Sequence, residues 1–126
     1  MSRFLNTMIL PLLATAAFAI TAVTPAMAFD NSGRATMTTS QLPKEGRETL
    51  ALIRKGGPYP YAKDSTIFSN RERALPREAR GFYHEYTVKT PGSRDRGARR
   101  IICGGARQQT CYYTADHYAT FKLINE

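Results

Sequence analysis

An apolar run near the start of the chain, Met8–Val23, limits how much of the 126 residues can build a folded domain. The run follows a short segment without acidic residues and ends at Ala26-Met27-Ala28, a small-x-small site of the type that signal peptidases accept. A membrane anchor is the alternative, but Pro11 interrupts the run, and a bilayer span needs about 20 apolar residues. We therefore expect a signal peptide over residues 1–28 and a secreted, extracellular domain over residues 29–126.

The domain that remains is small and strongly basic. It keeps 17 of the 18 Lys and Arg residues and all 10 Asp and Glu residues, a formal net charge of +7. Its length allows one domain with one core. A basic exported protein is expected to be attracted to polyanions such as nucleic acid, anionic lipid or acidic polysaccharide. A soluble surface that is basic without any such partner explains the charge equally well, so the charge alone does not select a function.

The two cysteines, Cys103 and Cys111, predict one disulfide, because an even number of cysteines in an exported chain usually pairs. The bridge would hold a hairpin or loop and contribute roughly 2–3 kcal/mol in the loop-entropy model. The chain has no Cys-x-x-Cys motif, which argues against a redox role. Its two His and two Cys show no ligand spacing, so we expect neither a metal site nor a cofactor.

Helix signals occur once in the domain, over Pro43–Lys55. Pro43 suits the first turn, and Glu45 places an acid where the helix dipole favours one. Leu50 and Ile53 give an apolar stripe, and Gly56-Gly57-Pro58 ends the segment. One helix is therefore expected near the start of the domain.

Strand signals follow a turn-rich stretch over residues 56–81, whose length is uncommon for a connection without a task. Aromatic and β-branched residues separated by turn signals predict antiparallel strands at residues 83–88, 98–103, 112–114 and 119–124. One helix followed by a run of strands is typical of the α+β class. The expected fold is one N-terminal helix packed on a twisted antiparallel β-sheet.

Strand periodicity separates Glu85 from its neighbour His84. Side chains alternate between the two faces of a strand, so Tyr83, Glu85 and Thr87 share one face. The other face carries His84, Tyr86 and Val88 and has the composition of a core face. Glu85 should therefore point away from the core, and its adjacency to His84 does not make the two a catalytic pair.

Three further polar side chains could join Glu85. Arg96 and Arg100 share a face if their segment is extended, and pairing with the Glu85 strand would bring a carboxylate to two guanidiniums. An ordinary cross-strand ion pair, worth about 0.2–1 kcal/mol, is the alternative. His117 lies in an Asp-His-Tyr turn between two strands, which should expose it, and a lone exposed His is more often without function.

Together these groups suit the cleavage of RNA without a metal ion. The reaction needs a base for the ribose 2′-OH, an acid for the leaving 5′-oxygen and cations for the phosphoryl oxygens. A non-catalytic cationic module that binds nucleic acid or membrane is the rival, but it has no need of Glu85 and His117 together. An enzyme acting on DNA is disfavoured, since DNA lacks the attacking 2′-OH.

The chain resembles the guanyl-preferring microbial ribonucleases, the family that includes barnase. Six segments carry the resemblance in the family's order: Gly57–Tyr61, Phe68–Glu72, Tyr83–Val88, Thr90–Gly92, Arg96–Ile102 and Thr114–Phe121. The Tyr-His-Glu-Tyr-Thr-Val and Thr-Pro-Gly segments are closest to the streptomycete-type branch. The resemblance implies an endoribonuclease that cleaves single-stranded RNA on the 3′ side of guanosine through a 2′,3′-cyclic phosphate, with a bell-shaped dependence of activity on pH.

The resemblance also assigns roles to single residues. Glu85 matches the general base, His117 the general acid, and Arg96 and Arg100 the phosphate-binding arginines, while Tyr118 matches an aromatic residue at the same site. The loop that reads guanine matches Phe68, Ser69, Asn70, Arg71 and Glu72. The Glu72 carboxylate could accept hydrogen bonds from guanine N1–H and the 2-amino group together, whereas adenine presents an acceptor there.

Some features depart from the streptomycete pattern. Cys103 and Cys111 do not match that branch's disulfide between the two chain ends, and Ser69 stands in place of a longer amide residue. The high charge suggests extra phosphate contacts, for which the candidates are Lys44, Arg47, Arg54, Arg77 and Arg80. As partners the resemblance implies RNA and an acidic, barstar-like protein inhibitor. We expect a monomer without stable membrane association once the signal peptide is removed.

Overall fold

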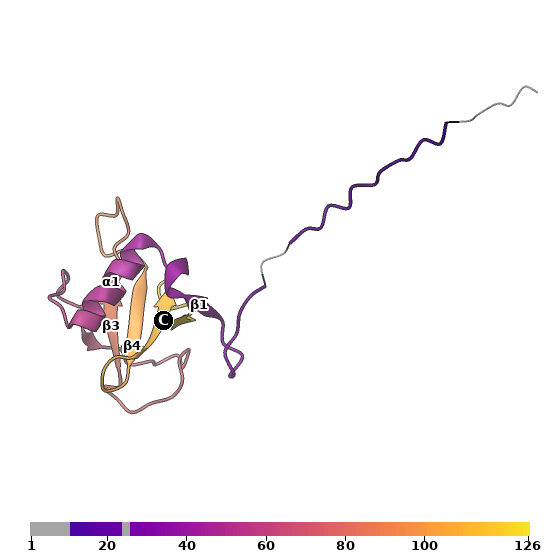
Figure 1. Ribbon diagram of the computed structural model, residues 1–126. Coiled ribbons are helices and arrows are strands. Elements are labelled where there is room, and N and C mark those ends of the chain that lie inside the picture. Colours follow the sequence, from indigo (N-terminus) through magenta and orange to yellow (C-terminus); the bar gives the residue numbers. More distant parts are fainter. Residues whose placement is uncertain (1–10, 24–25) are drawn as a thin grey trace, which may run out of the picture.

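The computed structural model describes residues 11–23 and 26–126 (Figure 1). Part of the predicted signal peptide, residues 1–10 and 24–25, lies outside the described residues, so the signal peptide stays a prediction. Residues 11–23 have exposed side chains and belong to no helix or strand. Among the described residues, no helix has the length and apolar character that a membrane crossing requires.

In the part of the chain that the structure describes, one α-helix lies across one face of a six-stranded sheet (Figure 1). The strand order is β1-β6-β5-β4-β3-β2, and all neighbouring pairs are antiparallel except β1 and β6, which are parallel. The elements are β1 (Thr36–Thr38), the 3₁₀ turn η1 (Thr39–Gln41), α1 (Lys44–Lys55), β2 (Thr66–Ile67), β3 (Tyr83–Thr87), β4 (Arg100–Gly104), β5 (Thr110–Thr114) and β6 (Lys122–Asn125). The predicted α+β class is confirmed, with one parallel pair added to the expected antiparallel sheet.

The helix matches its prediction closely. It begins at Lys44 and ends at Lys55, where Gly56 takes a left-handed conformation with φ of 84° and its N–H bonds to the carbonyl of Ile53. Leu50 and Ile53 are buried, as their spacing predicts. Gly46 is also buried, and an added Cβ there would lie 3.3 Å from the Leu42 side chain, so close packing explains a residue that otherwise weakens a helix.

The sheet buries side chains on both faces. The helix-side core contains Tyr86, Val88, Ile101 and Cys103, as the alternation of β3 and β4 predicts. The opposite face carries a second cluster made of Leu75, Tyr83, Ile102, Tyr112 and Phe121. This second cluster exists because the long connection after β2 folds back over part of the sheet. The rest of that face, around Glu85, stays open; it is called the open face below.

Three strands begin at other residues than predicted, and the ends of β3, β4 and β6 differ from the predictions by one residue each. β4 begins at Arg100 rather than residue 98, because Ala98 lies in a bend and its carbonyl accepts from the His117 N–H. β5 begins at Thr110 because its pairing with β4 extends to Gly104. β6 begins at Lys122 rather than residue 119, because a turn with positive φ at His117 and Tyr118 occupies the preceding segment. The strands β1 and β2 were not predicted, since they have only 3 and 2 residues.

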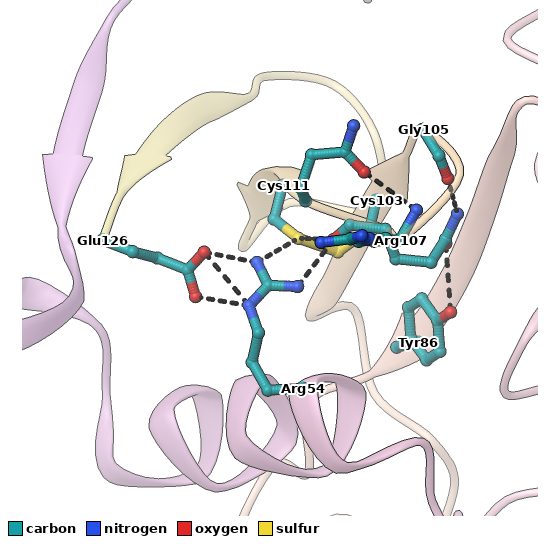
Figure 2. Close-up of a disulfide and its surroundings, with 9 residues drawn as sticks. Arg54, Tyr86, Cys103, Gly105, Arg107, Cys111 and Glu126 are labelled. Carbon is teal, nitrogen blue, oxygen red and sulfur yellow. Dashed lines mark hydrogen bonds and ion pairs between the residues drawn. A yellow bond between two sulfur atoms is a disulfide. The ribbon is translucent and has the colours of Figure 1, made fainter.

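The predicted disulfide joins Cys103 of β4 to Cys111 of β5, which lie directly opposite each other in the ladder. Arg54, in the last turn of α1, reaches this hairpin and donates to the Cys111 Sγ at 3.4 Å and to the Gln108 carbonyl at 2.7 Å (Figure 2). The same guanidinium pairs with the carboxylate of Glu126. Helix, hairpin and C-terminal residue are thus tied together on the helix side of the sheet.

Candidate active site

Glu85 lies in the middle of β3, on the open face, opposite Ile102 of β4. Its side chain is largely buried, with 9% of the residue exposed. One carboxylate oxygen accepts a hydrogen bond of 2.6 Å from the Tyr118 hydroxyl. The other lies 3.6 Å from Nη1 of Arg96, which also donates to the Thr87 hydroxyl at 2.9 Å. The carboxylate is therefore held between an aromatic donor and a cation.

Arg100 opens β4 and is almost fully buried, with 3% exposed. Its Nη1 donates to the carbonyls of Arg99 at 2.7 Å and Arg96 at 3.4 Å, and its Cζ lies 6.0 Å from the centre of the Tyr118 ring. Within the described part of the chain, its Nε has no hydrogen-bond partner although it is buried. A buried, unpaired donor on a cation is costly and suits a site that receives an anion.

His117 sits in a turn between β5 and β6 that the backbone reaches only under strain. His117 and Tyr118 have φ of 53° and 70°, a left-handed conformation that non-glycine residues rarely adopt. The His117 N–H donates to the Ala98 carbonyl at 3.0 Å, and the Tyr118 N–H to the Thr114 hydroxyl at 3.1 Å. A strained backbone conformation of this kind is retained when neighbouring residues hold it in place, and it is common at functional sites.

Asp116 organises the same turn. Its carboxylate accepts from the Thr120 N–H at 2.9 Å, from the Thr120 hydroxyl at 2.6 Å and from the Thr114 hydroxyl at 2.9 Å. These bonds, those from Thr120 first, lower the pKa of Asp116 to about 2. Asp116 was missed by the sequence analysis, which treated it only as part of the Asp-His-Tyr turn.

Tyr118 links the predicted acid to the predicted base. Its ring lies 4.8 Å from the His117 ring, measured between centroids, and its hydroxyl bonds to Glu85. Burial, and then the bond to the Glu85 carboxylate, raise the pKa of Tyr118, so the phenol stays a donor. Glu85, Arg96 and Arg100 therefore lie on the open face beside the turn that carries His117. The expectation that Arg96 and Arg100 share an extended strand was wrong, because Arg96 precedes β4 and Gly97 has a positive φ. His84 lies on the opposite face of β3, across from Cys103.

A cavity of about 360 Å³ opens beside this cluster. One wall is the segment Phe68–Glu72, which contains all five residues predicted to read guanine, and the other includes His117, Tyr118 and Phe121. The rings of Phe68 and Tyr118 are stacked with centroids 5.3 Å apart. Glu85 and Arg100 do not line the cavity, because Tyr118 lies between them and the hollow. The cavity and the charged cluster are thus adjacent compartments of one site.

The Phe68–Glu72 loop is held by its own side chains. Asn70 has φ of 50°, in the left-handed region that Asn adopts more readily than most residues. Its amide donates to the Leu75 carbonyl at 3.0 Å and accepts from the Leu75 N–H at 3.1 Å. Arg34 donates to the neighbouring Ala74 carbonyl at 2.6 Å from over the Tyr112 ring. No motif identifies Arg34, because the contact joins segments 40 residues apart.

Among residues 11–23 and 26–126, no group of three or more His, Cys, Asp or Glu side chains is placed to hold a metal ion. The polar groups of the site are instead a carboxylate, an imidazole, guanidiniums and a phenol. Such a set can transfer protons and bind an anion without further components.

Comparison with known proteins shows sequence similarity to ribonucleases. The ribonuclease family model matches residues 26–125. The chain is 56% identical over 91 residues to guanyl-specific ribonuclease Sa of Kitasatospora aureofaciens, covering 72% of this chain and 94% of the relative. It is 52% identical over 94 residues to guanyl-specific ribonuclease St of Saccharopolyspora erythraea, covering 75% and 91%.

Solved structures agree with the sequence relatives. Ribonuclease Sa2 with guanosine-2′-cyclophosphate matches with a TM-score of 0.68 at 49% identity, covering 73% of this chain and 96% of that one. A structure of ribonuclease Sa2 in complexes with mononucleotides matches with a TM-score of 0.70 at 47% identity, covering 82% and 98%.

Proposed function

Because this chain belongs to the ribonuclease family, we propose that it is a guanyl-specific endoribonuclease that cleaves single-stranded RNA on the 3′ side of guanosine through a 2′,3′-cyclic phosphate. The observation that carries the proposal is the position of Tyr118, which contacts His117 with its ring and Glu85 with its hydroxyl beside a cavity lined by Phe68–Glu72. Proton-transfer groups and a base-sized hollow thus share one face.

Glu85 and His117 divide the proton transfers. In the first step Glu85 takes the proton of the ribose 2′-OH while that oxygen attacks phosphorus, and His117 gives a proton to the leaving 5′-oxygen. The 2′,3′-cyclic phosphate and a free 5′-OH result. In the second step water attacks the cyclic phosphate, His117 takes the water's proton, and Glu85 returns one to the 2′-oxygen. The enzyme ends in its starting protonation state.

Arg96 and Arg100 supply positive charge where the phosphoryl oxygens gain negative charge. Arg100 is fixed by two carbonyls, so it needs no reorganisation when the substrate binds, and its buried Nε offers a donor to a phosphoryl oxygen. Arg96 lies beside Glu85 and can contact the same phosphate. No metal ion or other cofactor takes part in this scheme.

Guanine fits the cavity through the Phe68–Glu72 loop. Glu72 accepts hydrogen bonds from N1–H and the 2-amino group, and backbone N–H groups of the loop donate to O6 and N7. The Phe68 and Tyr118 rings give the cavity an aromatic side against which a base can pack. Adenine offers an acceptor where guanine offers N1–H, so it would leave Glu72 unpaired.

The cellular setting follows from the sequence and forms part of the proposal. Residues 1–28 act as a signal peptide, and the mature chain from Phe29 works outside the cell as a monomer, without lasting membrane association. A producing cell protects its own RNA with an acidic, barstar-like inhibitor. An inhibitor of this kind suits the net charge of +7 of the mature chain and would cover Arg96 and Arg100.

Incubation of the protein with GpU and with ApU, each in EDTA, tests the proposal. We expect turnover of GpU with transient guanosine 2′,3′-cyclic phosphate, and little turnover of ApU. Binding of RNA without turnover would favour a non-catalytic cationic module. Activity that EDTA abolishes would show that a metal ion is required and would refute the proposed chemistry.

A further inference from the structure

One long-range hydrogen bond supports residues 70–75, the segment that completes the guanine-reading loop. Nη1 of Arg34 donates to the Ala74 carbonyl at 2.6 Å, across 40 residues of sequence. Ala74 lines the cavity assigned to guanine and lies two residues after Glu72. In the part of the chain that the structure describes, no other hydrogen bond joins residues 70–75 to a distant segment. Arg34 is therefore the polar support of this segment from outside.

The peptide group between Ala74 and Leu75 connects Arg34 to Asn70. Its carbonyl accepts from Arg34, while its N–H donates to the Asn70 side-chain oxygen at 3.1 Å. The Asn70 side-chain nitrogen in turn donates to the Leu75 carbonyl at 3.0 Å. Hydrogen bonds in such a chain strengthen one another, because a cation at the carbonyl makes the N–H of the same peptide a better donor. The charge of Arg34 thus strengthens the bonds that hold Asn70 in the cavity wall.

The supported segment contains strained backbone. Asn70 and Arg73 have φ of 50° and 55°, both in the left-handed region, and the Arg73 N–H donates to the Asn70 carbonyl at 3.0 Å. Such conformations cost free energy and are retained only where neighbouring residues hold them. Glu72 lies between these two residues, so the direction of its carboxylate depends on the backbone that Arg34 supports.

Arg34 is itself held by the hairpin that precedes β1. The Asp30 carboxylate accepts from the Arg34 N–H at 2.7 Å, and the Asp30 N–H donates to the Arg34 carbonyl at 2.7 Å. The next residue, Ala35, is attached to β6 because its carbonyl accepts from the Leu123 N–H at 2.9 Å. The guanidinium lies over the Tyr112 ring, with Cζ 5.5 Å from the ring centre, a favourable place for a cation. The protein itself therefore fixes both the backbone and the side chain of Arg34.

We infer that Arg34 is a positioning residue for guanine recognition, an inference that rests on the proposed function. Arg34 does not line the cavity. From outside, it holds the Ala74 carbonyl, and through it Asn70 and the backbone that carries Glu72. A loop already held in its binding conformation loses less conformational freedom when the base binds. Adenine does not form the bonds that the loop offers, so the support benefits guanine selectively.

Arg34→Met tests this role, because it removes the charge and the donor but keeps an unbranched side chain over the Tyr112 ring. We expect KM for GpU to rise about five- to tenfold, the effect of one lost hydrogen bond. The kcat for GpU and the KM for ApU should stay nearly constant, since neither the proton-transfer groups nor adenine depends on the loop. Circular dichroism checks the fold, and Arg34→Gln replaces Arg34→Met if the latter does not fold.

Arg34→Lys and Arg47→Met are the matched controls. Lysine keeps a charged donor at position 34, so Arg34→Lys should restore most of the lost KM for GpU. Arg47 also donates through Nη1 to a carbonyl at 2.6 Å, that of Leu42. The sequence suggested Arg47 for a phosphate contact, but its helix α1 packs on the face of the sheet opposite to Glu85. Arg47→Met should therefore keep the KM of both dinucleotides, and a rise equal to that of Arg34→Met would overturn the inference.

Nucleotide binding separates failure of this inference from failure of the proposed function. Calorimetry with guanosine 3′-monophosphate and adenosine 3′-monophosphate requires no turnover. Arg34→Met should weaken binding of the guanosine nucleotide about five- to tenfold and leave the adenosine nucleotide nearly unchanged. Unchanged affinity for the guanosine nucleotide, or an equal loss for both, refutes the positioning role and leaves the proposed function intact. Selective loss without any turnover of GpU supports the role and refutes the catalytic proposal, and an unmodified protein that does not prefer the guanosine nucleotide refutes both.

Discussion

The two faces of the sheet use arginine in opposite ways. On the helix side, Arg54 engages the Glu126 carboxylate, the Gln108 carbonyl and the Cys111 sulfur. On the open face, Arg100 is more deeply buried, yet its Nε has no partner in the described part of the chain. The first arrangement is complete without a ligand, and the second becomes complete when an anion binds.

Left-handed backbone occurs on both sides of the molecule, but its residues differ. On the helix side, α1 ends at Gly56, which takes a positive φ without a steric cost, and Gln108 in the β4–β5 hairpin has φ of 51°. At the open face, Asn70, His117 and Tyr118 all have positive φ, which costs free energy for non-glycine residues. Two of these three residues belong to the turn that carries the predicted acid, so strain is accepted there to position polar groups.

The largest expected effect is on catalysis, from removal of either proton-transfer group. Glu85→Gln and His117→Ala should each lower kcat by about 10²–10⁴ on GpU, the usual contribution of acid–base catalysis. Folding should be retained, because neither residue belongs to the apolar clusters. Single-turnover kinetics with circular dichroism as a folding control measures this. A folded Glu85→Gln variant with nearly full activity would show that Glu85 is not the base.

A slightly smaller effect is expected on base selection, from Glu72→Ala. The loss of two hydrogen bonds to a charged acceptor should lower the ratio of GpU to ApU turnover by roughly 100-fold. Glu85→Ala should instead slow both dinucleotides and preserve their ratio. Measurement of kcat/KM for both substrates in both variants decides this point. An equal change of ratio in the two variants would contradict the division between recognition and chemistry.

The sequence predicted the parts of the molecule that local pattern controls. The apolar stripe of α1, the alternation in β3 and β4, and the pairing of the cysteines are readable because each depends on neighbours in the chain or on a unique partner. The strands β1 and β2 escaped, since elements of 3 and 2 residues contain too little pattern.

The site was predicted as a set of residues, and its supports were not. The resemblance to a known family named Glu85, His117 and the guanine loop, and the structure gathers them on one face. The roles of Asp116 and Arg34 could not be predicted. Asp116 acts through a turn whose geometry is unusual, and Arg34 through a contact between distant segments. The Arg34 contact depends on tertiary structure that no local motif encodes, whereas the Asp116 bonds are local but belong to a left-handed turn without a recognisable sequence pattern.

On the helix side, removal of the disulfide should affect stability and leave chemistry unchanged. We expect the Cys103→Ser and Cys111→Ser double variant to lose roughly 2–3 kcal/mol of unfolding free energy, because the loop is short and its closure restricts the unfolded chain modestly. Urea denaturation measures the loss, and KM for GpU should stay within twofold of the unmodified value. A large change in KM with intact folding would show that the two faces are coupled.

The smallest effect is expected where stability and positioning meet, at Asp116. Hydrogen bonds from Thr120 and Thr114 lower the pKa of this carboxyl from 3.8 to about 2, so its ionised form stabilises the fold. That contribution is present above the ordinary pKa and is lost as the pH falls through the lowered one. Asp116→Asn should therefore show a lower Tm than the unmodified protein at neutral pH, with the difference shrinking from about pH 4 to pH 2.

The activity of the same variant indicates what the carboxylate is for. Because Asp116 fixes the turn that carries His117, Asp116→Asn should lower kcat for GpU several-fold at neutral pH. The ratio of GpU to ApU turnover should stay constant, since Asp116 makes no bond to the guanine loop. Thermal unfolding and kinetics over the same pH range provide both readouts. A Tm difference that persists unchanged to pH 2 would mean that the charge of Asp116 does not stabilise the turn. The hydrogen bonds of a neutral side chain would then be sufficient to hold His117 in its strained position.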